Sequence, residues 1–196
     1  MKNTYRIILD MKGLTMQNKG GLFEMTKHEY YTYTKEELLN KGAKLPVIVM
    51  EDNAAVFQSM AEEMTEEIKK NNAEGKKTVF ICPVGPVGQY PYFVEMVNKE
   101  KISLKNVWFI NMDEYLDDDK KWVPETHPLS FRGFMNRTVY SQIDPELVMP
   151  EEQRVFPDPE NVEYIPQLIE KLGGVDICFG GIGINGHVAF NEADAS

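Results

Sequence analysis

The chain has 196 residues, of which 42% are hydrophobic, and it carries a formal net charge of -10 at pH 7. These values are typical of one soluble globular domain, and the negative charge disfavours proteins that bind nucleic acid or an anionic membrane surface. The sequence has no run of about 18 apolar residues, and its polar start, MKNTYR, lacks the apolar core of a signal peptide. Cys82 and Cys178 lie inside apolar runs, which favours buried reduced thiols over a disulfide or a metal site. We therefore expect a cytoplasmic protein.

The first half of the chain predicts two strands and a helix. The candidate strands are RIILDM (6–11) and VIVMED (47–52). Apolar residues then recur every fourth position over 54–70, which indicates an amphipathic helix. Asp52 or Asn53 is placed to cap the first turn of this helix.

The second half alternates apolar strands with helices. TVFICPV (78–84), VWFINM (107–112) and VDICFGG (175–181) are nearly all apolar, as strands buried on both faces of a parallel sheet should be. Helices are expected over roughly 91–99, 129–140 and 160–172. The pattern predicts an α/β fold over residues 1–196: a doubly wound, mainly parallel sheet with helices on both faces, a Rossmann-like three-layer sandwich.

Ligands of such sheets bind beyond the carboxyl ends of the strands, so the three strand exits are the places to look for a site. The first exit is PVGPVGQYP (83–91), where backbone N–H groups and a helix N-terminus could hold a phosphate. It matches neither the dinucleotide fingerprint nor the P-loop spacing, and its prolines have no N–H to donate. A plain turn and an anion-binding loop both remain open, and the candidate ligand contacts are Gly85, Val87 and Gly88.

The second exit is NMDEY (111–115), where Asp113 and Glu114 follow directly on a buried strand. Burial raises the pKa of a carboxyl group toward neutral pH, so Asp113 is a candidate general base and Glu114 a candidate substrate contact. The alternatives are a helix cap or a solvated corner. The adjoining LDDDKKW (116–122) indicates a charged surface loop, and we expect no metal site.

The third exit is GGIGINGHVAFNE (180–192). His187 is the candidate proton shuttle, with Glu192 and Asn185 placed to orient its ring. Glycines permit close approach of the backbone to a ligand, so Gly181, Gly183 and Gly186 are candidate substrate contacts. The alternative is a tight turn after a buried strand, with a structural histidine.

NMDEY, HPLSF (127–131) and GGIGINGHVAFNE resemble, in order and spacing, three motifs of the glucosamine-6-phosphate deaminase (isomerase) family, which shares its fold with the 6-phosphogluconolactonases. The resemblance covers roughly residues 45–196, and the ending AFNE favours the deaminase branch. It implies conversion of an amino sugar phosphate to fructose 6-phosphate and ammonia without a cofactor. Asp113 matches the base that moves a proton between C2 and C1, His187 matches the group that opens the ring, and Glu192 matches the carboxylate that orients and charges that histidine. We also expect a homo-oligomer.

The sequence departs from the family pattern at two places. Asn185 stands where the family usually has aspartate, and the PTGGTP-like run appears as PVGPVG, in which Val84 and Val87 lack hydroxyl groups. These departures keep open a catalytically weakened sugar-phosphate-binding protein, and a lactone hydrolase of the sister branch is a further alternative. Family members continue beyond the third motif, so residues 1–196 are expected to lack the C-terminal part of the domain.

Overall fold

The computed structural model describes residues 7–9, 34, 36–37, 47–160, 162–183 and 186–191. The chain divides into two compact units, Met1–Val56 and Phe57–Ser196, and each is treated by itself. The prediction that residues 1–196 form one domain stays a prediction. Among the described helices, none combines the length and the apolar character that a membrane span needs.

The first unit contains the two predicted strands. β1 (Ile7–Leu9) and β2 (Val47–Val49) form a parallel pair, in which Ile8 lies opposite Ile48. β2 ends earlier than predicted because Asp52 caps the following helix: its Oδ1 accepts a hydrogen bond of 2.9 Å from the Ala55 amide. That helix is α2 (Asn53–Ala73), which begins in this unit and extends three residues beyond the predicted end.

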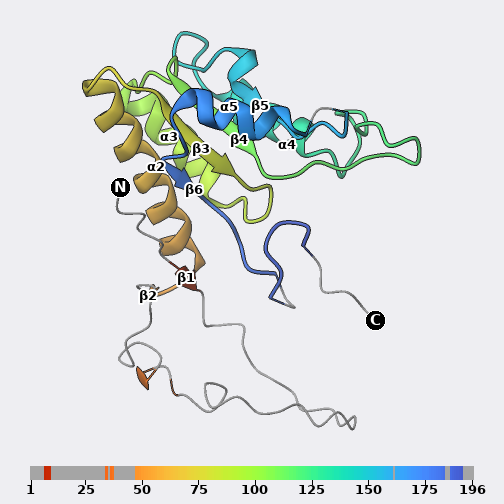
Figure 1. Cartoon of the computed structure of the whole chain (residues 1–196). Coiled ribbons are helices and arrows are strands. Elements are labelled where there is room, and N and C mark those ends of the chain that lie inside the picture. The colour runs from red at the N-terminus through yellow and green to blue at the C-terminus, as the bar shows by residue number, and fades with distance from the viewer. Residues whose placement is uncertain are drawn as a thin grey trace, which may run out of the picture. The chain divides into compact units, whose positions relative to one another are not determined.

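The second unit is built on a parallel sheet of four described strands (Figure 1). The strands are β3 (Thr78–Cys82), β4 (Val107–Asn111), β5 (Arg154–Val155) and β6 (Ile177–Cys178), in the order β5-β4-β3-β6. The register places Phe80 of β3 opposite Phe109 of β4 and Ile177 of β6. The predicted α/β fold with a parallel sheet is confirmed.

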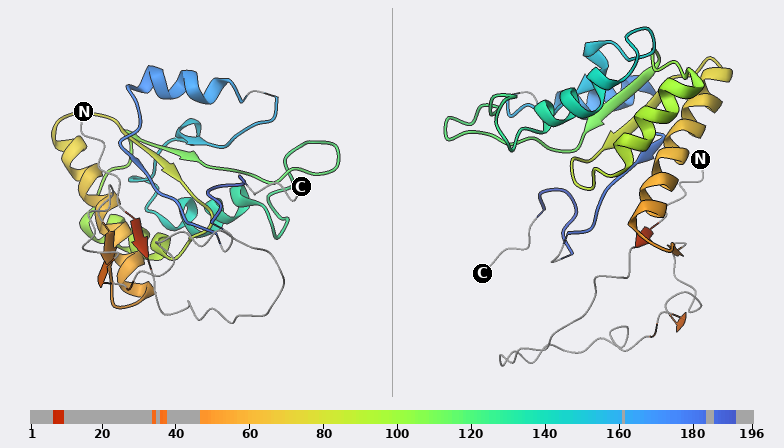
Figure 2. Two further views of the ribbon diagram at one scale, coloured as in Figure 1. Left: turned by 60° about the horizontal axis from the view of Figure 1, so that its bottom comes forward. Right: turned by 180° about the vertical axis from the view of Figure 1, so that it is seen from behind.

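Helices cover both faces of this sheet, as predicted. They are α3 (Gln89–Glu100), α4 (Phe131–Thr138) and α5 (Tyr164–Leu172), with short 3-10 helices η2 (Tyr140–Gln142) and η3 (Glu151–Gln153). Figures 1 and 2 show α5 on one face of the sheet and α3 and α4 on the other. The part of α2 that lies in this unit runs beside α3, where Lys69 pairs with Glu100 at 3.0 Å.

Aromatic side chains on the two central strands form the core between the sheet and its helices. Phe80 and Phe109 are fully buried, with ring centroids 6.0 Å apart. Phe93 of α3 packs 5.7 Å from Phe109, and Tyr140 of η2 lies 6.3 Å from the same ring. Burial of these rings fixes β3 and β4 at the centre of the unit, and therefore fixes where both strands end.

The edge strands differ most from the sequence prediction. β5 was not predicted, because a two-residue strand leaves no periodic signal. β6 has two residues where seven were expected over 175–181. It is an edge strand among the described residues, and the chain turns from the ladder into the glycine-rich third exit just after Phe179, whose amide still bonds to the Ile81 carbonyl at 2.9 Å.

Candidate active site

The strand order brings the three predicted exits to one edge of the sheet. The chain moves outward from β3 to β4 and β5, and then returns to β6 on the other side of β3. Because all four strands are parallel, their carboxyl ends face the same way. The exits of β3 and β6 are therefore neighbours at the point where the winding direction changes, which is where doubly wound sheets bind ligands.

Two side chains in the first turn of α3 donate hydrogen bonds to the loop that follows β3. The Tyr90 hydroxyl donates to the Pro83 carbonyl at 2.5 Å, and Gln89 Nε2 donates to the Pro86 carbonyl at 2.9 Å. Both side chains are buried. These bonds fix the carbonyls on either side of Gly85, whose φ is +128° and whose peptide bond to Pro86 is cis.

The N-terminus of α3 opens directly onto this loop. Gly88 occupies the cap position without a side-chain hydrogen bond, and a Cβ there would lie 2.2 Å from the Phe57 ring. Val87 is 36% exposed, and the buried Gln89 Oε1 has no hydrogen-bond partner among the described residues. The loop leads directly into a helix N-terminus, which attracts anions, but its described side chains offer no cation and no hydroxyl group. The plain turn and the anion-binding loop therefore both stay predictions for this segment.

Close backbone contacts join the third exit to the other two. A Cβ built on Gly181 would lie 2.7 Å from Pro86 Cδ and 3.3 Å from the Gly85 carbonyl oxygen, so only glycine allows the two loops to meet. A Cβ on Gly180 would lie 3.4 Å from Met112 Cε, beyond the end of β4. All three predicted exits therefore converge.

Asp113 lies half-buried just past the end of β4. The neighbouring Met112 amide bonds to the Cys82 carbonyl at 2.9 Å, which ties this exit to the end of β3. Burial raises the pKa of Asp113 above its ordinary value of 3.8, and the negative charge of Glu114 raises it further. A carboxyl group in this setting is a better base than an exposed aspartate.

Glu114 turns inward and caps α4. Its Oε1 accepts hydrogen bonds from the Tyr115 and Phe131 amides at 2.8 and 2.9 Å, and its Oε2 accepts one from the Arg132 amide at 2.8 Å. The Arg132 guanidinium adds an ion pair at 3.3 Å, and the Glu114 side chain has no exposed surface. These contacts are those of a helix cap, which was one of the alternatives for this exit. The contact of Glu114 with substrate stays a prediction.

His187 lies on a compact turn of the third exit. The Gly183 amide donates to the His187 carbonyl at 2.9 Å, and the Gly186 amide donates to the Gly183 carbonyl at 2.9 Å. The imidazole ring packs on Gly183, since a Cβ there would lie 2.1 Å from His187 Cε1. Asn185 and Glu192 lie outside the described residues, so their predicted roles beside His187 stay predictions.

Aromatic contacts tie the His187 turn to the Asp113 exit. The Phe190 ring lies 5.1 Å from Tyr115 and 5.9 Å from Phe131, and these two rings lie 5.1 Å from each other. Sequence reasoning missed this contact, because the three residues are far apart along the chain. It also missed Arg132, since nothing local shows that the guanidinium meets a carboxylate eighteen residues earlier.

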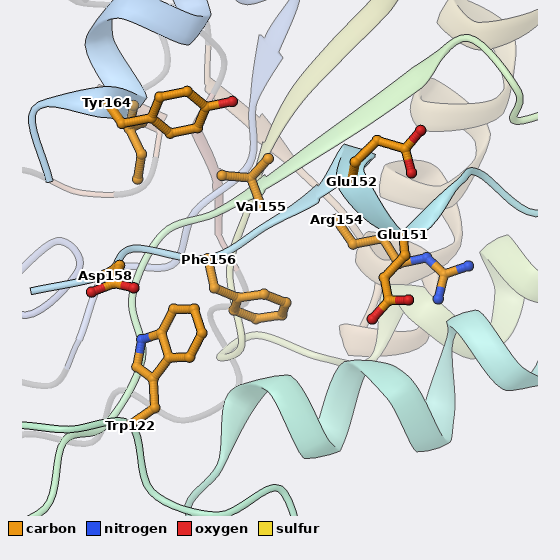
Figure 3. Close-up of a pocket in the computed structure, with 9 residues that line it drawn as sticks. Trp122, Glu151, Glu152, Arg154, Val155, Phe156, Asp158 and Tyr164 are labelled. Carbon is orange, nitrogen blue, oxygen red and sulfur yellow. The ribbon is translucent and has the colours of Figure 1, made fainter. Parts of the chain in front are cut away.

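The structure also contains a separate cavity of about 250 Å³ along β5 (Figure 3). Trp122, Phe156 and Tyr164 surround it together with acidic side chains of η3. None of the predicted site residues that the structure describes lines it. Among the described residues, no group of three or more histidine, cysteine or acidic side chains is arranged to hold a metal ion.

The chain is similar to curated glucosamine-6-phosphate deaminases. It is 33% identical over 159 residues to the one from Phocaeicola vulgatus, a match that covers 76% of this chain and 57% of that protein. It is 32% identical over 154 residues to the one from Caenorhabditis elegans, covering 76% and 56%. The chain thus spans little more than half the length of these relatives. No protein-family model matches it.

A solved structure shows the same architecture. A monomeric glucosamine-6-phosphate deaminase, described as a missing link of the NagB superfamily, superposes with a TM-score of 0.59 at 26% identity. The match covers 71% of this chain and 56% of that one. The curated relatives, this architecture and the converging exits agree, and the chain belongs to the glucosamine-6-phosphate deaminase family.

Proposed function

We propose that this chain carries the proton-transfer residues of an amino-sugar-phosphate deaminase. The supporting observation is that a half-buried aspartate with a raised pKa and a histidine turn lie on exits that contact each other. The name of the curated relatives, glucosamine-6-phosphate deaminase, supports glucosamine 6-phosphate as the proposed substrate. The family resemblance implies fructose 6-phosphate and ammonia as the products. The predicted homo-oligomer stays a prediction, and the similar solved structure is described as monomeric.

The proposed reaction assigns one proton step to each side chain. His187 delivers a proton to the ring oxygen and opens the sugar, and Glu192 orients the imidazole ring. Asp113 takes the proton from C2 and returns it to C1, which moves the carbonyl character from C1 to C2. The C1 oxygen takes up a proton as C2 becomes an imine. One water then adds to the imine carbon and ammonia leaves, which gives the ketose.

The β3 exit is the proposed phosphate end of the site. Its backbone is held in place by Tyr90 and Gln89, and the N-terminus of α3 attracts negative charge. Gly85, Val87 and Gly88 are the proposed contacts there. Gly181, Gly183 and Gly186 are the proposed contacts along the third exit, where the absence of side chains permits close approach of a sugar.

Ammonia release from glucosamine 6-phosphate tests this proposal. The Asp113→Asn variant should lose turnover by at least about 100-fold and keep sugar-phosphate affinity, because a base acts in the transition state while the whole pocket binds. Asp118→Asn, an exposed change in the neighbouring loop, is the matched control and should keep full activity. Full turnover by Asp113→Asn would refute the role of Asp113 as the base.

The second candidate is a weakened sugar-phosphate-binding protein. Asn185 and the hydroxyl-free PVGPVG loop favour it, because an amide supplies no charge to the imidazolium and the loop lacks side-chain donors. Binding without ammonia release in the parent would support this candidate. Asn185→Asp should then restore turnover by about 10-fold or more if the missing charge is what limits the reaction.

A further inference from the structure

Both oxygens of the Glu114 carboxylate contact other groups of the protein. Both oxygens accept backbone hydrogen bonds, two of them from the first turn of α4, and Ser130 Oγ lies 3.4 Å from Oε2. A buried carboxylate is costly unless its charge is compensated. Here the helix N-terminus and the Arg132 guanidinium compensate it. The side chain therefore has little freedom, and its backbone is fixed with it.

The same contacts immobilise the neighbours of Asp113. On one side, the Met112 amide is bonded to the Cys82 carbonyl. On the other side, Glu114 is clamped to α4 and the Tyr115 ring packs against Phe131. Within the described part of the chain, Asp113 makes no comparable hydrogen bond of its own, so the residues that flank it determine the conformation of its backbone.

We propose that Glu114 is a positioning residue for Asp113: it clamps the exit of β4 to the first turn of α4 and thereby fixes where the Asp113 carboxyl group sits at the edge of the sheet. This role rests on the proposed function in one respect, since it matters for catalysis only if Asp113 is the base. The clamp itself is independent of any activity.

Charge gives the clamp a second effect. Burial raises the pKa of Asp113 and the negative charge of Glu114 raises it further, while the charge of Asp113 in turn helps to raise the pKa of the Tyr90 phenol. Arg132 faces Glu114, and Glu125 lies 3.6 Å from the far side of the same guanidinium. Removing the charge of Glu114 should therefore lower the pKa of Asp113, whereas removing that of Glu125 should not change it.

The test compares Glu114→Gln with Glu125→Gln, because both remove one negative charge beside Arg132 but only Glu114 accepts bonds from the α4 amides. NMR follows the titration of the Asp113 carboxyl group and the hydrogen exchange of the Phe131 and Arg132 amides. Glu114→Gln should lower the Asp113 pKa and speed exchange of both amides by about 10-fold or more. Glu125→Gln should leave both measurements as in the parent.

Glu114→Asp separates the clamp from the charge. It keeps the negative charge but shortens the side chain by one methylene, so amide exchange should speed up while the Asp113 pKa falls less than in Glu114→Gln. A folded Glu114→Gln protein with the parental Asp113 pKa and parental exchange of the Phe131 and Arg132 amides would overturn the proposal. If neither Glu114 variant folds, Glu114 is required for folding and the positioning role is also overturned.

Neither NMR measurement needs turnover, so failure of the clamp and failure of the proposed function are distinguishable. A parent that releases no ammonia would refute the proposed activity while leaving the titration and exchange results to decide the clamp. An active parent whose Glu114→Gln variant keeps the parental turnover, the parental pKa of Asp113 and the parental exchange of both amides would overturn the clamp alone.

Discussion

The Asp113 exit and the His187 exit lie at the same edge of the sheet, but they are held by different kinds of contact. Glu114 anchors the first exit with buried charge-assisted bonds to backbone amides and an ion pair to Arg132. The second is held by short backbone bonds around Gly183 and by Phe190, whose side chain is 51% exposed. Bonds of the first kind are worth more and fail together, whereas an exposed ring contact contributes little. The proposed base therefore lies on the exit with the stronger anchors, and the proposed acid lies on the exit with the weaker ones.

Removing the Glu114 carboxylate, which anchors the Asp113 exit, should cause the largest loss of stability. Glu114→Ala leaves buried α4 amides and the Arg132 guanidinium without their partner, which should lower the free energy of unfolding by about 3 kcal/mol. Denaturant unfolding measures this loss. Glu125→Ala, at the exposed end of the same arginine, should change stability by less than about 1 kcal/mol. Equal losses in the two variants would show that Glu114 is not the stronger anchor.

A methyl group at Gly181 should disturb the junction of the β3 and β6 exits. In Gly181→Ala the new Cβ meets Pro86 and the Gly85 backbone, and overpacking of this kind costs about 2 kcal/mol of stability. Gly180→Ala is the control, because its Cβ meets only the flexible end of Met112 and should cost less than about 0.5 kcal/mol. If chemical denaturation gives the two variants the same stability, the exits do not meet as closely as described.

Truncation of Phe190 tests how much its ring contacts stabilise the His187 exit. Phe190→Ala removes ring contacts with Tyr115 and Phe131, which should cost about 1 kcal/mol because the ring is half exposed. Val188→Ala, at a similar exposure in the same turn, should be nearly neutral in the same thermal and denaturant assays. A loss as large as that of Glu114→Ala would contradict the proposed difference between the exits.

The smallest expected effect is the pH dependence that Asp113 gives to stability. Its folded pKa is raised above 3.8, so the folded state binds the proton more tightly than the unfolded chain does. Its contribution to stability is therefore present below pH 3.8 and is lost as pH rises through the folded pKa.

Asp113→Asn should accordingly gain slightly in stability relative to the parent as pH rises toward neutral. This gain in the free energy of unfolding should be smaller than the loss caused by Phe190→Ala. Unfolding curves at several pH values measure the difference, with Asp118→Asn as an exposed control. A difference that does not change between acid and neutral pH would contradict the raised pKa of Asp113. The same shift predicts that turnover falls, on acidification, at a higher pH than an ordinary aspartate would give.

The sequence by itself determined the central elements and indicated the sheet edge at which the candidate site is proposed. Apolar runs predicted β3 and β4, and apolar residues at every fourth position predicted α2, each within a few residues. Such patterns are local signals that the sequence shows directly. The strand-exit rule then placed Asp113, His187 and the glycines at one edge. The motifs NMDEY, HPLSF and GGIGINGHVAFNE indicated the family that the curated relatives share.

Only the tertiary structure decided how these segments meet. The two-residue strands β5 and β6 gain their hydrogen bonds from β4 and β3 and so have no signal of their own. The close approach of Gly181 to Pro86 and the ring contacts of Phe190 join residues far apart in the chain. The sequence predicted that both adjacent carboxylates, Asp113 as a base and Glu114 as a substrate contact, face the site. Their environments separate them, because the backbone turns one into the amides of α4 and leaves the other half-buried at the edge of the sheet.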